Sequence, residues 1–384
     1  MSFMLDEEQR AFREAARDFA AQVLAPHAAE WDEHSIFPRD AIAQAGELGF
    51  CGLYADPAIG GLGVSRLSAA LVFEELATAD PSTTAYISIH NMATWMLGEW
   101  GSDAIKQTWG NELTSGRKLA SYCLTEPNAG SDAASLTTRA RLDGGDYVID
   151  GAKAFISGGG ASDLLIVMAR TADTGARGVS AFAIPADTKG VSFGKQEKKL
   201  GWHSQPTCAI SFDSVRIPQD HRLGAEGEGF KFAMKGLDGG RINIAACSLG
   251  AAQAALDAAR SHLNSRKQFG QTLANFQGLQ FRLADMAIQL VAAREMVHGA
   301  ARRLDAGSAD ATVWCAMAKR FATDAGFAVV NEALQLHGGY GYLRDYPLER
   351  LLRDCRVHQI LEGTNEIMRV IVARHLLGTD KELR

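Results

Sequence analysis

A glutamate near the carboxyl end of the chain stands in a setting that suits a general base. Glu362 follows an apolar stretch, and Thr364 is a plausible N-cap for a helix that carries Ile367 and Val370 on one face. Burial would raise the pKa of Glu362, whereas the positive end of that helix would favour its charged form. Proton abstraction near neutral pH requires such a balance. Taken alone, however, a glutamate at a helix start is more often a partner of the helix dipole.

Three further segments combine turn residues with polar groups that could hold a ligand. Residues 122–132 join a strand-like start to a turn, and residues 266–270 and 335–342 each end a predicted helix. The first segment could bind a polar ligand, basic residues of the second could contact a phosphate, and paired glycines in the third would allow close backbone approach. A plain connection between domains and two ordinary helix C-caps are the alternative explanations.

Other catalytic motifs are absent from the sequence. The glycine-rich stretch 224–229 has the wrong order and context for a dinucleotide fingerprint, and no P-loop or G-x-S-x-G elbow occurs. The ten histidines form no H-x-x-x-H cluster, so we expect no metal. The formal net charge of −6 argues against broad nucleic-acid binding. The six cysteines are dispersed without a C-x-x-C pair, which suggests a reducing compartment.

Helical periodicity marks both ends of the 384-residue chain, and strand-like patterns mark its middle. We expect a helical domain over residues 1–117, a small antiparallel β-domain over 118–228 and a bundle of long helices over 229–384. No run of about 18 apolar residues occurs, so we expect no membrane span. Because no basic start precedes an apolar run, the expected location is the cytoplasm, or the mitochondrial matrix after removal of a presequence.

Taken together and in this order, the four segments resemble the acyl-CoA dehydrogenase family over nearly the whole chain. Residues 122–132 resemble its YxxTEPxxGSD signature, 266–270 its RxxFG segment, 335–342 its QxxGGxGY signature and 362–364 its catalytic EGT. The resemblance implies an α+β fold with an all-helical N-domain, a small antiparallel β-domain and a C-terminal four-helix bundle. It also implies that FAD lies between the β-domain and the bundle.

The resemblance implies two main groups of FAD contacts. The group on the flavin side, where Phe155 stands in place of a tryptophan common in the family, consists of Tyr122, Leu124, Thr125, Ser131, Phe155, Ile156 and Ser157. The group that holds FAD across a subunit boundary consists of Arg266, Phe269, Gln277, Gln335, Leu336, His337, Gly338 and Gly339, and Phe276 is a further implied cofactor contact. Further implied cofactor contacts are Thr364, Asn365 and Glu366. A shared cofactor implies an obligate dimer, usually paired into a homotetramer.

The resemblance gives Glu362 the removal of the α-proton of an acyl-CoA thioester, followed by hydride transfer from the β-carbon to flavin N5. The backbone N–H of Glu362 and a flavin ribityl hydroxyl are implied to stabilise the enolate oxygen. The implied substrate contacts are Ser131, Asp238, Gly239, Gly240, Arg241, Gly363 and Arg374. A helix-surface ion pair is the alternative for Asp238 and Arg241. The implied electron acceptor is an electron-transferring flavoprotein.

Within the family, residues 199–207 and 237–245 are most similar to the subgroup that acts on isobutyryl-CoA. The expected reaction is therefore oxidation of isobutyryl-CoA to methacrylyl-CoA in valine catabolism. The missing side chains at Gly239 and Gly240 suggest space for an α-methyl branch, and some relatives carry the base where Gly240 stands. The alternatives are a 2-methylbutyryl-CoA or butyryl-CoA (short-chain) dehydrogenase, an oxidase that passes electrons to oxygen, and a non-catalytic helical scaffold that binds acyl-CoA.

Overall fold

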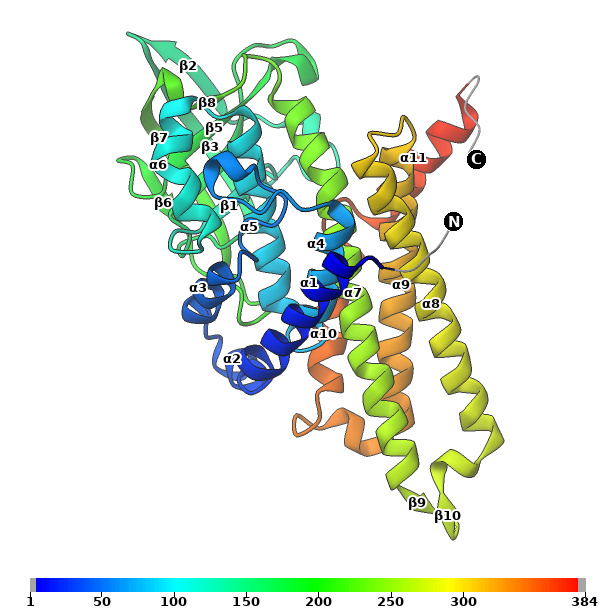
Figure 1. Ribbon diagram of the computed structural model, residues 1–384. Helices are drawn as coiled ribbons and strands as arrows, with labels where there is room; N and C mark the ends of the chain where they lie inside the picture. The colour runs from blue at the N-terminus through cyan, green and yellow to red at the C-terminus, as the bar shows by residue number, and fades with distance from the viewer. Residues whose placement is uncertain (1–4, 379–384) are drawn as a thin grey trace.

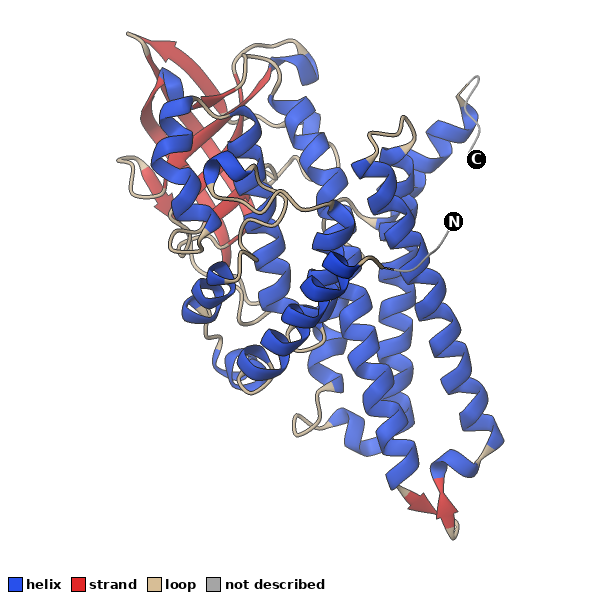
Figure 2. Cartoon of the chain, viewed as in Figure 1, coloured by secondary structure: helices blue, strands red, loops and turns tan. Residues whose placement is uncertain are grey.

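The computed structural model describes residues 5–378 as a helical region, a β region and a second helical region (Figures 1 and 2). The first helical region contains α1 (Glu7–Phe19), α2 (Ala28–His34), α3 (Arg39–Glu47), α4 (Arg66–Ala77), α5 (Pro81–Trp100) and α6 (Asp103–Thr114). A π-helical turn, Ala20–Leu24, continues α1. The side chains of Asp6, Ser65, Asp80 and Ser102 cap α1, α4, α5 and α6, each accepting a hydrogen bond from a backbone N–H in the first turn.

The middle region is one eight-stranded sheet with strand order β6-β7-β3-β2-β4-β5-β8, and β1 pairs with β4 off this path. Its strands are β1 (Ala120–Cys123), β2 (Arg139–Asp143), β3 (Asp146–Ser157), β4 (Leu164–Arg170), β5 (Val179–Pro185), β6 (Val191–Phe193), β7 (Thr207–Pro218) and β8 (Arg222–Leu223). The hairpin between β2 and β3 turns at Gly144 and Gly145, which both have positive φ.

The sheet is mixed, so the expectation of antiparallel strands alone is wrong. β1 runs parallel to β4, with Ala120 opposite Leu164, and β2 meets β4 in parallel at Arg139 and Arg170. The other strand pairs of this sheet are antiparallel. β1 follows α6, and two strands intervene before β4. No hairpin therefore fixes the direction of β1 against β4, and alternating apolar residues do not reveal which distant strands pair.

The second helical region is a bundle of α7 (Gly229–Ser265), α8 (Gln277–Asp305), α9 (Ala311–His337) and α10 (Leu348–His358), with α11 (Asn365–Leu377) packed on α9. A ribbon of β9 (Lys267–Gln268) and β10 (Gln271–Thr272) lies at the far end of α7 (Figure 1). α7 is long and apolar enough to cross a membrane, but 72% of its most apolar window is buried inside the protein. Such burial is typical of the core helix of a bundle.

One hydrophobic core joins the two helical regions. It combines buried aromatic side chains such as Phe50 and Phe73 with small ones on α7 and α9, such as Ala246 and Ala318. Small side chains let these two long helices approach closely. Two further clusters cover the two faces of β4, one against α5 and the start of α7 and one within the sheet. The segment after α10 contacts both α7 and α9, so it rests on this shared core.

Candidate active site

The loop between α10 and α11 holds Glu362 in a left-handed backbone conformation. The φ angle is +56° at Glu362 and +86° at Gly363. A left-handed non-glycine residue is uncommon, and such residues cluster at functional sites. Thr364 caps α11 by accepting a hydrogen bond of 3.4 Å from the backbone N–H of Ile367, which confirms the predicted N-cap. The loop therefore presents Glu362 just before a helix start.

The carboxylate of Glu362 lies against the bare backbone of Gly240 on α7. A Cβ at position 240 would stand 2.5 Å from Oε2 of Glu362 and 2.9 Å from its Cδ. Oε2 is buried, and no group within residues 5–378 donates a hydrogen bond to it. Because buried polar atoms normally find partners, an unpaired carboxylate oxygen indicates a place for a ligand.

Burial raises the pKa of Glu362 to about 7, although the positive charges of Arg241 and Lys319 oppose this rise. Arg241 donates from Nε to the backbone carbonyl of Glu362 at 3.3 Å, and Lys319 donates from Nζ to the carbonyl of Gly363 at 2.8 Å. The hydroxyl of Tyr122 is also buried without a partner in the described chain. Burial and the negative charge of Glu362 raise the pKa of Tyr122 well above its usual value.

Side chains of the protein lie where a Cβ on Gly239 or Gly240 would stand, so space there for a substrate α-methyl branch stays a prediction. A Cβ at position 239 would stand 2.4 Å from Nη1 of Arg66. The Arg66 guanidinium packs over the ring of Tyr54, 3.6 Å from its centroid, and lies 4.8 Å from the centroid of Trp95. The two glycines therefore make room for a cation and for the Glu362 carboxylate.

Asp238 and Arg241 form a buried ion pair and not a pair on the helix surface. Nη1 of Arg241 lies 2.7 Å from Oδ1 of Asp238, and the two side chains are only 5% and 12% exposed. The hydroxyl of Thr312 donates to Oδ2 of Asp238 at 2.6 Å. Burial raises the pKa of Asp238, against the effects of Arg241 and Thr312. These contacts fix the guanidinium that holds the Glu362 carbonyl.

The predicted flavin-side residues that follow β1 are hydrogen-bonded to β3 just before Phe155. The carbonyl of Leu124 accepts a hydrogen bond of 3.1 Å from Nζ of Lys153, and the carbonyl of Thr125 accepts one of 2.9 Å from the N–H of Ala154. The register of β3 against β7 shifts after Lys153, and Phe155 has a φ of +57° and is 68% exposed. Such bulges aim a side chain out of the sheet. Nearby, Ser131 is exposed, Ile156 is buried and Ser157 is half-buried.

The second predicted group of FAD contacts lies at the opposite end of α7. Arg266 follows the last residue of α7, and its guanidinium lies 5.2 Å from the ring centroid of Tyr340. Phe269 is 93% exposed with a φ of +53°. The helix from Arg241 to Arg266 is about 37 Å long at about 1.5 Å per residue. Within one chain, the two groups are therefore far apart (Figure 1).

Contacts between rings and open backbone characterise the rest of this second group. Phe276 packs edge-on against Phe269 with centroids 6.1 Å apart, and Gln277 begins α8. The ring of His337, near the end of α9, stacks on that of His262 at 4.3 Å. A Cβ at Gly338 or Gly339 would meet no atom within 4 Å. The end of the bundle therefore has room for a further molecule beside α9.

Of the predicted contacts that follow Glu362 in the sequence, some are bonded within the protein and others are exposed. The side chain of Asn365 accepts a hydrogen bond of 2.9 Å from Lys319 and donates to Thr323 at 3.0 Å and to Asp324 at 2.7 Å. It is therefore engaged within the protein. Glu366 in the first turn of α11 and Arg374 in its last turn are exposed.

Sequence reasoning missed Tyr54, Arg66 and Lys319. For Lys319 one signal was available, because the lysine stands between Ala316 and Ala322 in an alanine-rich, apolar stretch of α9. A charged residue on such a face needs a buried partner. Tyr54 and Arg66 lie on segments distant in sequence from the predicted motifs, and nothing local marked them.

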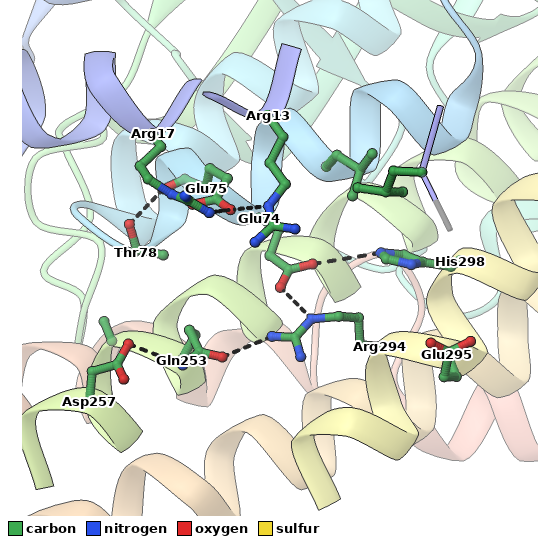
Figure 3. A pocket seen from close by; sticks show the side chains of 13 residues that line it. Arg13, Arg17, Glu74, Glu75, Thr78, Gln253, Asp257, Arg294, Glu295 and His298 are labelled. Atoms are coloured by element: carbon green, nitrogen blue, oxygen red, sulfur yellow. Dashed lines mark hydrogen bonds and ion pairs between the residues drawn. The ribbon is translucent and has the colours of Figure 1, made fainter. Parts of the chain in front are cut away.

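A polar cavity of about 620 Å³ between α1, α4, α7 and α8 contains none of the predicted site residues (Figure 3). Its arginines pair with glutamates of the same lining. Arg294 lies 2.7 Å from Glu74, and Glu75 lies 2.6 Å from Arg13 and 2.8 Å from Arg17. The three arginines of the lining are therefore engaged by its own glutamates and are not turned toward a ligand.

Family models, similar sequences and similar structures all point to the same protein family. Family models for the N-terminal, middle and C-terminal domains of acyl-CoA dehydrogenase match residues 6–117, 121–215 and 227–377. Mitochondrial isobutyryl-CoA dehydrogenase from Bos taurus is 54% identical, covering 98% of this chain and 90% of the relative. Its counterpart from Dictyostelium discoideum is 52% identical, covering 98% and 91%. The solved structure of butyryl-CoA dehydrogenase from Megasphaera elsdenii matches with a TM-score of 0.95 at 40% identity, covering 98% and 100%. The chain belongs to the acyl-CoA dehydrogenase family.

Proposed function

We propose that this enzyme oxidises isobutyryl-CoA to methacrylyl-CoA, with Glu362 as the base that removes the α-proton. The protein is an FAD-dependent acyl-CoA dehydrogenase. The two isobutyryl-CoA dehydrogenases that are 54% and 52% identical over nearly the whole chain support this substrate. One observation above all supports the role of Glu362: its buried Oε2, set against Gly240, has no partner in the described chain.

The chemistry of this position agrees with proton abstraction from a thioester. With a pKa of about 7, Glu362 is substantially ionised at neutral pH and still basic enough to take a proton. The backbone N–H of Glu362 makes no hydrogen bond within residues 5–378. A free donor beside the carboxylate can stabilise the negative charge that develops on the thioester oxygen.

The flavin-side residues fit a flat aromatic ligand. Phe155 presents an exposed ring outside the sheet, and the buried hydroxyl of Tyr122 has no partner in the described chain. Leu124 and Ile156 are buried beside them and would keep water away from the ring. When bound, FAD supplies the acceptor for the hydride that leaves the β-carbon of the substrate.

The separation of the two FAD groups along α7 supports a cofactor shared between subunits. About 37 Å of helix is longer than one extended dinucleotide can bridge while also placing its flavin at Glu362. We propose that Arg266 and its neighbours hold the FAD of a partner subunit in a homodimer, and that two dimers form a homotetramer. The proposed electron acceptor is an electron-transferring flavoprotein. The two mitochondrial relatives support a mitochondrial location, with the cytoplasm as the alternative.

The test is loss of flavin absorbance on anaerobic mixing with isobutyryl-, 2-methylbutyryl- and butyryl-CoA. We expect isobutyryl-CoA to bleach the flavin fastest, and Glu362→Gln to keep FAD but lose nearly all bleaching. Glu295→Gln, an exposed position on α8, is the matched control and should bleach normally. A clear preference for butyryl-CoA would change the substrate, and near-normal bleaching by Glu362→Gln would place the base elsewhere. Peroxide formed in air would identify an oxidase.

A further inference from the structure

Lys319 on α9 is completely buried, and its ammonium has two neutral oxygen partners. Nζ donates to the backbone carbonyl of Gly363 at 2.8 Å and to Oδ1 of Asn365 at 2.9 Å, and the side chain is 0% exposed. Placing an ammonium in such surroundings costs free energy unless its interactions repay the loss of hydration. The burial of a charged lysine at position 319 is therefore not explained by packing alone.

The first contact of Lys319 acts on the backbone next to the base. Gly363 follows Glu362 directly, and both have left-handed φ angles of +86° and +56°. Such a conformation persists only where surrounding contacts fix it. The second contact ties the loop to α9, because Asn365 also donates to Thr323 and Asp324. Lys319 thus holds the loop on both sides of the N-cap of α11.

The charge of Lys319 acts on the carboxylate of Glu362 as well. The positive charge lowers the pKa of Glu362, and the negative charge of Glu362 favours the ammonium of Lys319. Burial, helped by the positive charge of Arg241 on α7, lowers the pKa of Lys319 to about 8 although Glu362 opposes this change. An ammonium with this pKa is still largely charged at neutral pH.

The other titratable groups around Lys319 do not replace this interaction. His358 on α10 is kept neutral near pH 7, because burial and the charge of Lys319 lower its pKa to about 3. Asp324 on α9 and Glu366 on α11 also favour the charged lysine, but their effect is weaker than that of Glu362. The charge of Lys319 is therefore paired electrostatically with the base above all.

We propose that Lys319 is a positioning residue for the base: its ammonium clamps the carbonyl that follows Glu362 and aims the carboxylate at the substrate α-carbon. Its positive charge also favours the ionised carboxylate. The inference rests on the proposed role of Glu362. Lys319 itself lies behind the loop and acts on the reaction through Glu362 alone.

The test compares Lys319→Met, which removes the donor and the charge, with Lys319→Gln, which keeps a donor but no charge. Flavin bleaching by isobutyryl-CoA is measured against pH in the FAD-loaded enzyme. We expect both variants to keep FAD and to shift the acidic midpoint upward by about one pH unit, because loss of a nearby positive charge raises the pKa of a carboxyl. The limiting rate at high pH should fall on the order of 10-fold in Lys319→Met and less in Lys319→Gln, with substrate affinity changed less than about 3-fold.

The matched control is Arg294→Met, which removes a cation, here a partly buried one, from another long helix of the bundle. Arg294 contacts Glu74 and Gln253 and none of the loop residues. We expect this variant to lose thermal stability but keep the wild-type midpoint. A merely structural role of Lys319 would give the same result.

The outcomes separate this inference from the proposed function. A wild-type pH midpoint in the Lys319 variants, or failure of both to fold with FAD, overturns the positioning role while Glu362→Gln still abolishes bleaching. If the wild-type enzyme is bleached by no short acyl-CoA, or if Glu362→Gln bleaches normally, the proposed function itself fails.

Discussion

The Glu362 carboxylate occupies the place that a side chain on residue 240 would take, since a Cβ there would lie 2.5 Å from Oε2. Two segments far apart in the sequence share one small volume at this point. The size of residue 240 therefore decides whether the base can reach its working position.

We expect Gly240→Ala to lower the limiting rate of flavin bleaching by about 100-fold or more, because the added methyl group displaces the carboxylate. Stability and FAD content should change little, since alanine is a better helix former than glycine. The measurement is stopped-flow bleaching together with the ratio of flavin to protein. Gly299→Ala on α8 is the control: its Cβ would meet only a side-chain nitrogen of Arg303 at 4.0 Å, so it should leave the rate unchanged.

Ionisation of Glu362 should destabilise the fold, because burial raises its pKa from 4.5 to about 7. Between these pH values the folded protein holds a proton that the unfolded chain has released, so stability falls as pH rises through this window. Glu362→Gln removes this cost. We expect the variant to be about 1–3 kcal/mol more stable than wild type at pH 8, with the gain lost at pH 4.5. Thermal unfolding at the two pH values measures it, and an equal gain at both would contradict the cause.

Lys153→Met should destabilise the protein by about 3–5 kcal/mol, because it leaves the carboxylate of Glu126 buried without its cation. The two side chains are 0% and 4% exposed, with Nζ 2.8 Å from Oε1. FAD retention should weaken too, since the carbonyl of Leu124 loses its donor. Thermal unfolding and flavin content measure both effects. Adding Glu126→Gln removes the unpaired charge and should restore part of the lost stability. No recovery in the double variant would mean that packing is the main contribution of Lys153.

Phe155→Ala should weaken FAD binding about 10-fold or more while leaving the fold intact, because the ring is 68% exposed and free to stack on a ligand. Phe155→Trp should retain FAD. Dissociation of the cofactor followed by flavin fluorescence gives the comparison. Leu142→Ala, an exposed apolar position on β2, controls for loss of surface area on the same sheet and should retain FAD. Unchanged binding in Phe155→Ala would remove this ring from the flavin wall.

Features that depend on neighbours in sequence could be predicted. Thr364 as an N-cap follows from cap chemistry within three residues, and the order of helical and β regions follows from hydrophobic periodicity. The position of Glu362 just before α11 follows from the same pattern. These features depend on interactions between residues close in sequence, so the local sequence contains all the groups that determine them.

Features that depend on distant contacts could not be predicted. The i, i+3 spacing of Asp238 and Arg241 allows either a surface ion pair or a buried one. The pair is buried because Thr312 on α9 and the loop of Glu362 pack against it. From the sequence, Gly239 suggests empty space, but in the structure the guanidinium of Arg66 lies where a Cβ on this residue would stand. The direction of β1 against β4 is likewise set by pairing across some forty residues, about which the alternation of apolar side chains says nothing.

Because α7 is so long, each chain would contribute residues to two reaction centres. If Arg266 binds the cofactor of the partner subunit, a variant at Glu362, beside Gly240, and a variant at Arg266, after the end of α7, should complement each other. In a mixed dimer of Glu362→Gln and Arg266→Ala chains, one centre carries both defects and the other carries none. We expect each variant alone to lose most turnover, and random mixing of the two should then restore about a quarter of wild-type turnover.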